Sequence, residues 1–122
     1  MFTLTADLVM DIHDEVLNPA ELRGLAGNKS LDGALARVEN RLAYGLIADV
    51  FDLAAAYAIA VSQGHCFNDG NKRTAFRCMM VCLEANGIDT AFDTEATGQA
   101  IIRAAQRLMD EGELAEWLRE RL

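Results

Sequence analysis

The 122-residue sequence lacks a long apolar run. Its longest uncharged apolar stretch, Leu53 to Val61, is too short to cross a bilayer. The first residues contain no basic segment followed by an apolar one, so no signal peptide is apparent. No repeat, low-complexity tract or strand-rich block occurs either. We therefore expect one cytoplasmic globular domain spanning residues 1–122, with a single core and no membrane partner.

Cysteine and basic residues are also scarce. The three cysteines form an odd set without a C-x-x-C pair, and with two histidines they give no zinc-binding spacing. Cys78 and Cys82, one turn apart on an apolar helix, are expected to be buried thiols. The net charge of −8 argues against direct binding to nucleic acid or to an anionic membrane.

Apolar residues recur at helical spacing along most of the chain, which predicts an all-α, compact bundle of about six helices. Thr5 is expected to cap the first helix, and Ser30 or Asp32 the second. Residues 49–62 are apolar almost all round and rich in alanine, so they should form a central buried helix. The next helix should run over residues 71–85.

The C-terminal third predicts two further helices. Asp93 or Thr94 should start the first, and Gly112 should break it. Its inward side chains should be Ile101, Ile102, Ala105, Leu108 and Met109. The final amphipathic helix should carry Leu114, Trp117, Leu118 and Leu122 on its apolar face.

A dense polar stretch interrupts the predicted core after the central helix. It is His65-Cys66-Phe67-Asn68-Asp69-Gly70-Asn71-Lys72-Arg73-Thr74. Polar groups within a core are costly unless they are paired or functional. Gly64 should end the preceding helix, Asp69-Gly70 should form a turn, and Asn71 should lie at the start of the next helix. Free backbone amides at such a helix start form an anion-binding site.

The side chains of this stretch suit phosphoryl or nucleotidyl transfer. Lys72 and Arg73 would attract phosphate, and Asp69 suits a magnesium ion. Histidine titrates close to neutral pH, so His65 is a candidate general base. Each of these residues alone has an ordinary structural explanation. Together within ten positions they favour a catalytic site. Cys66 beside His65 also allows a Cys–His nucleophile, which ranks lower because neighbours in a turn need not face each other.

The stretch resembles the H-x-F-x-D-[AG]-N-K-R motif of the Doc toxins, a branch of the Fic superfamily. The segments Leu31–Ala43 and Tyr44–Gly64 and the helix ending at Asn86-Gly87 are also similar in order and spacing. The resemblance implies the all-α Fic/Doc fold, with the active-site loop between the central helix and the next. Phe67 within the motif is expected to plug into the core and fix the loop.

The resemblance implies the toxin of a toxin–antitoxin pair. Such a toxin transfers phosphate from ATP, with Mg²⁺, to a Ser or Thr hydroxyl of a protein, in that family elongation factor Tu, and stops translation. His65 would be the base, Asp69 the metal ligand, and Lys72 with Arg73 would neutralise developing charge. The residues that the resemblance assigns to nucleotide binding are Phe67, Asn68, Gly70, Asn71, Lys72 and Arg73.

Two other functions stay open. AMP transfer to a protein hydroxyl is favoured by Gly70, where Doc relatives often have alanine. It is opposed by Lys72, where the AMP-transferring branch has glycine, and by Phe76, where that branch has arginine. The third possibility is a non-catalytic module that holds nucleotide or antitoxin.

Regulation is expected to come from a second chain. No inhibitory S/T-x-x-x-E-[GN] segment is recognisable. The resemblance therefore implies a small antitoxin whose C-terminal segment folds into a groove near the active site. The glycine-containing segment 21–30 should lie near the mouth of the site, as a mobile flap or a plain connection. His13, beside Asp14, is expected to be a packing or surface histidine.

Overall fold

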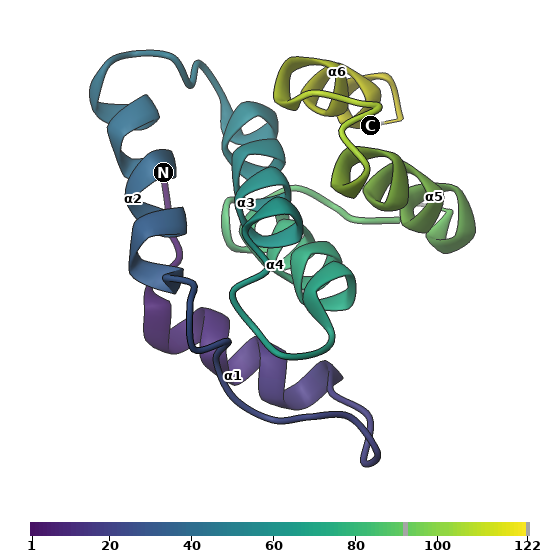
Figure 1. Ribbon diagram of the computed structural model, residues 1–122. Helices are drawn as coiled ribbons and strands as arrows, with labels where there is room; N and C mark the ends of the chain where they lie inside the picture. The colour runs from purple at the N-terminus through teal and green to yellow at the C-terminus, as the bar shows by residue number, and fades with distance from the viewer. Residues whose placement is uncertain (92, 122) are drawn as a thin grey trace.

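The computed structural model describes residues 1–91 and 93–121. Within those ranges it contains six helices and no strand, which confirms the predicted all-α class (Figure 1). The helices are α1 Ala6–Val16, α2 Leu31–Ala43, α3 Val50–Gly64, α4 Asn71–Ala85, α5 Thr94–Ala105 and α6 Glu111–Glu120.

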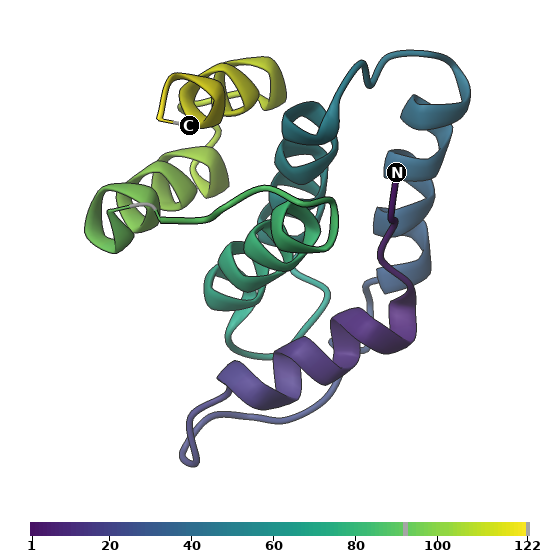
Figure 2. The ribbon, with the colours of Figure 1, turned by 180° about the vertical axis from the view of Figure 1, so that it is seen from behind.

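Helix α3 lies at the centre, as predicted from its apolar composition. It packs against α2, α4, α5 and α6, while α1 crosses one end of the bundle against α4 and α2 (Figures 1 and 2). The alanines of α3 are small enough to let neighbouring helices approach closely, and five of them are buried: Ala54, Ala55, Ala56, Ala58 and Ala60. Tyr57 is buried among them, and its hydroxyl accepts a 2.9 Å hydrogen bond from the Leu4 amide, which fixes the N-terminal segment.

Side-chain caps set the starts of most helices. Of the six helices in the described ranges, five begin with a residue whose side chain accepts a hydrogen bond from the first turn. These caps are Thr5, Ser30, Asp49, Asp93 and Asp110. Thr5 is the predicted cap, and Ser30 rather than Asp32 caps α2. Asp93, one of the two predicted starts of the fifth helix, is its cap.

The break between α5 and α6 differs from the prediction. Gly112 does not end the earlier helix but lies in the first turn of α6. Asp110 and Glu113 form a capping box that starts α6 two residues before the glycine. The chain reverses direction before it, where Arg107 adopts a left-handed conformation with φ of 62°.

Two apolar side chains predicted to face inward do not. Ile102 is 37% exposed and Leu108 is 69% exposed, because α5 ends before Leu108 and Ile102 lies on its outer side. In α6 Leu114 and Leu118 are buried and Trp117 packs partly against the core. Leu122, predicted on the same face, lies outside the described residues.

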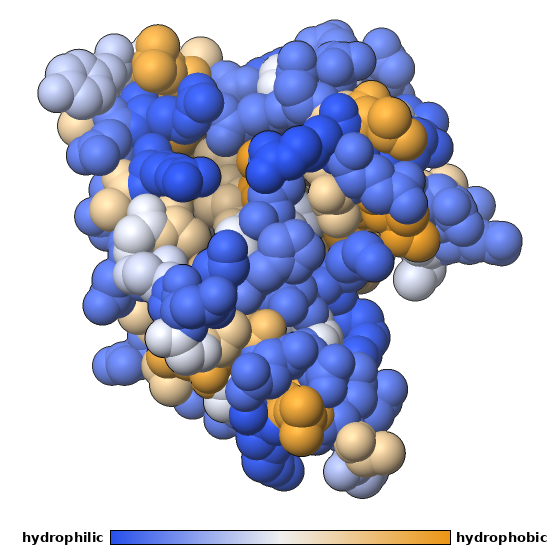
Figure 3. Space-filling view, viewed as in Figure 1, coloured by the Kyte–Doolittle hydropathy of each residue, from blue (hydrophilic) through white to orange (hydrophobic). Residues whose placement is uncertain are grey.

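The surface viewed in Figure 3 is mostly hydrophilic, with apolar patches between charged side chains and a hollow over α3. No helix in the part of the chain that the structure describes is long and apolar enough to cross a membrane.

Candidate active site

The motif loop begins where α3 ends. The last helical residue is Gly64, as predicted, but the left-handed conformation falls on His65, with φ of 47°. A non-glycine residue in this region carries on the order of 1 kcal/mol of strain, and such strain is common at functional sites. The turn leaves His65 exposed at the rim of a pocket, and its imidazole makes no hydrogen bond to the described residues.

That pocket has a volume of about 330 Å³ and gathers nearly all of the predicted site. It is lined by Ser62, His65, Asn68, Asp69, Gly70, Asn71, Lys72 and Arg73. Of the predicted site residues only Phe67 is absent from the lining. Ser62, on the last turn of α3, was not anticipated, since nothing in its local sequence marks it.

Phe67 instead anchors the motif loop in the core. Its side chain is 3% exposed, and its ring stacks on the imidazole of His13 with 3.8 Å between centroids and 8° between planes. His13 is itself 1% exposed, and its Nε2 donates to the carbonyl oxygen of Asp69 at 2.8 Å. Phe67 plugs into the core, as expected, and of the two roles left open for His13, packing or surface, the structure shows packing.

Asn71 closes the loop on itself. Its Oδ1 accepts from the amide of Phe67 at 3.1 Å, and its Nδ2 donates to the carbonyl of the same residue at 2.9 Å. One side chain therefore satisfies both backbone groups of a buried residue. Asn71, predicted to contact phosphate, thus also has a structural task within the loop.

The connection between α1 and α2 runs alongside the motif loop. The amide of Ala26 donates to the carbonyl of Cys66 at 2.8 Å, and that of Asn68 to the carbonyl of Gly24 at 3.1 Å. The side chain of Asn68 adds a 2.9 Å bond to the carbonyl of Arg23. The segment expected at the mouth of the site is therefore hydrogen-bonded to the loop along residues 23–26.

The start of α4 is built differently from the other helix starts. Its N-cap is Gly70, with φ of 77°, and no side chain caps it. Its first turn contains Lys72 and Arg73 and no acidic residue. The first amides of a helix lack partners within the helix, so they are available to an anion in the pocket. Lys72 is exposed and makes no hydrogen bond or ion pair within the described residues.

Asp69 and Arg73 are held by the end of α1 and by the connection from α1 to α2. The amide of Leu22 donates to Asp69 Oδ2 at 2.8 Å, while Asp69 Oδ1 has no hydrogen bond from the described residues. Arg73 donates through Nη1 to the carbonyl of Val16 at 2.6 Å and through Nη2 to the carboxylate of Glu21. Sequence reasoning missed Glu21, because no local pattern marks a contact between residues 52 positions apart.

The metal-ligand set is small. Among residues 1–91 and 93–121, no three or more His, Cys, Asp or Glu side chains come together as a metal site. Mg²⁺ is commonly held by one or two carboxylates together with substrate phosphates. The free Oδ1 of Asp69 fits that mode, in which the substrate itself would supply most of the other ligands.

Cys66 is poorly suited to nucleophilic catalysis. Its side chain is 1% exposed, does not line the pocket and lies 3.5 Å from the carbonyl of Ser30. Burial raises the pKa of the thiol, which disfavours the reactive thiolate. The structure therefore disfavours a Cys–His nucleophile.

A second, mostly apolar pocket of about 360 Å³ adjoins the first. It lies between α4 and α5 and is lined by Lys72, Arg73, Phe76, Thr94, Gly98, Ile101 and Ile102. Because Lys72 and Arg73 line both pockets, a polar and an apolar compartment share one cationic wall.

Comparison with known proteins identifies the class to which this fold and site belong. The model of the Fic/DOC family matches residues 3–83, and the chain belongs to the Fic/Doc family, as its motif predicted. The chain is also similar to a protein of Escherichia phage P1, "Protein kinase doc". The two are 30% identical over 117 residues, which cover 95% of this chain and 92% of the phage protein.

Proposed function

We propose that this protein is the toxin of a toxin–antitoxin pair and transfers the γ-phosphate of ATP to a Ser or Thr hydroxyl of a protein. Membership of the Fic/Doc family and the similarity to a phage protein named as a kinase support this reaction. The proposed target is elongation factor Tu, which would place the action in the cytoplasm. Its modification would stop translation.

The proposed roles follow from the pocket. His65 at its rim takes the proton of the acceptor hydroxyl as the oxygen attacks the γ-phosphorus. The bond to the oxygen that bridges the β- and γ-phosphates then breaks, and ADP leaves. Lys72 and the first amides of α4 stabilise the charge that develops on the transferred group. Asp69 would hold Mg²⁺, which neutralises phosphate charge and orients the donor.

One observation carries the proposal: an uncapped helix start with two cations and a histidine line the same pocket. Phosphate groups fit such a helix start, because its amides and cations are both donors to anions. The adjoining apolar pocket adds support, since a nucleotide has an apolar base as well as a charged phosphate chain. An inorganic anion alone would leave this compartment unused.

Intact-mass spectrometry of purified elongation factor Tu tests the reaction. The factor is incubated with this protein, ATP and magnesium, and in parallel with the His65→Ala variant. A phosphate-sized gain that the variant makes about 10²–10⁴-fold more slowly supports the proposal and the role of His65. An unchanged target mass would contradict it and would favour a non-catalytic module or another target.

AMP transfer is the second candidate, and the same experiment separates it through an AMP-sized gain. Gly70 favours it by resemblance. Lys72 opposes it, because its side chain stands in the helix start where AMP-transferring relatives have glycine. An AMP-sized gain would show that Lys72 does not determine how the nucleotide binds.

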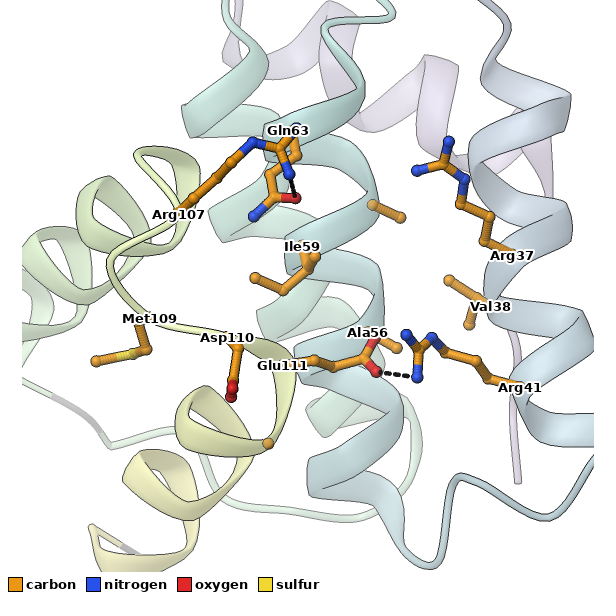
Figure 4. A pocket seen from close by; sticks show the side chains of 12 residues that line it. Arg37, Val38, Arg41, Ala56, Ile59, Gln63, Arg107, Met109, Asp110 and Glu111 are labelled. Atoms are coloured by element: carbon orange, nitrogen blue, oxygen red, sulfur yellow. Dashed lines mark hydrogen bonds and ion pairs between the residues drawn. The ribbon is translucent and has the colours of Figure 1, made fainter.

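The family also implies an antitoxin partner, and we propose a cleft for it. The cleft, of about 550 Å³, lies over α3 between α2 and the link from α5 to α6 (Figure 4). Its floor includes Ala56 and Ile59, and three arginines stand around it. Those arginines are Arg37, Arg41 and Arg107. Asp110 and Glu111 also line the cleft, so its lining has three cations and two carboxylates. An amphipathic segment with acidic residues would match the apolar floor and the excess of cations.

Two of these arginines already have partners. Arg41 pairs with Glu111 at 3.0 Å, and Arg107 donates to Gln63 at 2.9 Å. Arg37 makes no hydrogen bond or ion pair with the described residues, so it is available to a partner. Gln63 lies two positions before His65, so a segment in this cleft would also lie near the catalytic loop.

A charge reversal tests the cleft. Arg37→Glu should weaken binding of a candidate antitoxin's C-terminal peptide and leave the modification of the target unchanged. Arg103→Glu, on α5 outside the cleft, is the matched control. Equal loss of binding in both variants would mean that general charge, rather than this cleft, attracts the peptide.

A further inference from the structure

The turn after α1 presents a carboxylate to the motif. Glu21 donates its amide to the carbonyl of Asn18 at 3.0 Å, and its Oε1 accepts from the amide of Asn18 at 2.8 Å. Its other oxygen, Oε2, faces Nη2 of Arg73. Both carboxylate oxygens are therefore engaged, and the side chain is only 23% exposed. Glu21 is thus held in one place, directed at a residue of the candidate site.

The arginine is held from two sides. Besides Glu21, it contacts the carbonyl of Val16, the last residue of α1. The hydrogen bond from Arg73 holds the pKa of Glu21 below its ordinary value, so this carboxylate is ionised throughout the physiological range. The start of α4 therefore has two cations and two carboxylates near it: Glu21, which is paired with Arg73, and Asp69, which lines the same pocket.

That balance is unfavourable for a strongly anionic ligand. Phosphate oxygens that approach Arg73 must share its N–H groups with Glu21 or displace it, and either arrangement brings like charges together. The next residue of the turn, Leu22, donates to Asp69, so the same turn restrains both charged groups. Lys72 is left as the cation of the pair without a partner among the described residues.

We propose that Glu21 is a residue of the nucleotide site and competes with the donor's phosphate groups for Arg73, so that it lowers the affinity for nucleotide. The inference rests on the proposed function, since it takes a nucleotide as the ligand. The opposite role is equally testable: if Glu21 served to orient Arg73 toward phosphate, its removal would weaken binding. The two roles therefore differ in the sign of one measured change.

Calorimetric titration of the full chain with Mg·ATP measures that sign. Glu21→Gln retains the length of the side chain and an oxygen for the Asn18 amide but removes the charge. Since partly exposed ion pairs contribute little, the expected gain in affinity is about twofold to fivefold at low salt. Glu39→Gln is the matched control, because Glu39 is an exposed residue of α2 without a hydrogen bond or ion pair to the described residues.

Salt dependence separates competition for charge from a change in loop structure. The gain should shrink at high ionic strength, because exposed charges are screened there. Glu21→Ala should change affinity in the same direction, and circular dichroism of both variants checks their folding. Equal or weaker binding by folded Glu21→Gln, or a gain that persists at high salt, would overturn the inference. If the wild type and both variants fail to bind nucleotide, the proposed function and the inference about Glu21 are both wrong.

Discussion

The imidazole of His13 lies flat against the ring of Phe67 and hydrogen-bonds the carbonyl of Asp69. Because a carbonyl only accepts, Nε2 must carry the proton, which fixes the tautomer of this buried histidine. A residue of α1 thus holds the motif loop at two points, although it does not line the pocket. The first helix is therefore part of the scaffold of the candidate site.

Truncation of this histidine should lower the stability of the fold. His13→Ala should lower the free energy of unfolding by about 2–4 kcal/mol, since it removes a buried ring and a hydrogen bond. His13→Phe keeps a ring for stacking but loses the bond to Asp69, so its loss should be smaller. Urea denaturation measures both. Equal losses of stability in His13→Ala and His13→Phe would mean that the stacking on Phe67 contributes nothing. A stability of His13→Ala close to that of the wild type would contradict a packing role for His13.

The two hydrogen bonds between the Asn71 side chain and the backbone of Phe67 give a prediction about local stability. Asn71→Ala should cost about 1–2 kcal/mol, because two backbone groups of a buried residue lose their partner. The amide of Phe67 should then exchange its hydrogen faster, which exchange measured by NMR detects residue by residue. Asn40→Ala, at an exposed position of α2, should change stability by less than about 0.5 kcal/mol. An unchanged exchange rate at the Phe67 amide would mean that the Asn71 side chain does not protect it.

The parts of the structure that sequence predicted correctly depend on local chemistry. Thr5 and Ser30 cap helices because their hydroxyls reach an amide three residues ahead, a relation contained in the sequence itself. The motif likewise folds into one pocket because its residues are contiguous and end in a helix start. For such features a short window of sequence is sufficient.

The features that the sequence predicted wrongly or not at all depend on competing local signals or on contacts between residues far apart in the chain. Glycine alone predicts a helix break at Gly112, but the capping box of Asp110 and Glu113 outweighs it and starts a helix that includes it. The contact between Glu21 and Arg73 joins residues on different elements, so no periodicity or spacing could reveal it. The charge balance of the candidate site was therefore the feature least accessible from sequence.

The three cysteines give a chemical prediction. Burial raises the pKa of Cys78 and of Cys82 to about 12, and it also raises that of Cys66. At about pH 8 none should react with iodoacetamide in the native protein, because thiolates are the reactive form. All three should react in urea, and mass spectrometry counts the adducts. Cys66→Ser should leave target modification unchanged, whereas loss of the reaction in a folded variant would revive the Cys–His alternative.

Helix α6 is tied to the start of α3 by one arginine. Arg119 donates through Nε to Asp49 Oδ2 at 2.9 Å and through Nη2 to Asp49 Oδ1 at 3.0 Å. The same Nη2 lies 2.7 Å from Asp52 Oδ1. Asp49 is also the N-cap of α3, so its carboxylate holds the central helix and the last helix together. The hydrogen bond from Arg119 lowers the pKa of Asp49 below its ordinary value.

A lowered carboxyl pKa stabilises the fold above the pKa of the unfolded state, and this stabilisation is lost as pH falls through the lower folded value. Arg119→Ala should therefore lower the free energy of unfolding by about 1 kcal/mol near neutral pH, as expected for a partly exposed network. The difference from wild type should shrink as pH falls through the lowered pKa of Asp49, where its carboxylate takes up a proton. Urea denaturation across this range measures it, with Arg103→Ala on α5 as the control. A difference that stays constant with pH would mean that Arg119 contributes through packing of its aliphatic stem rather than through the carboxylates.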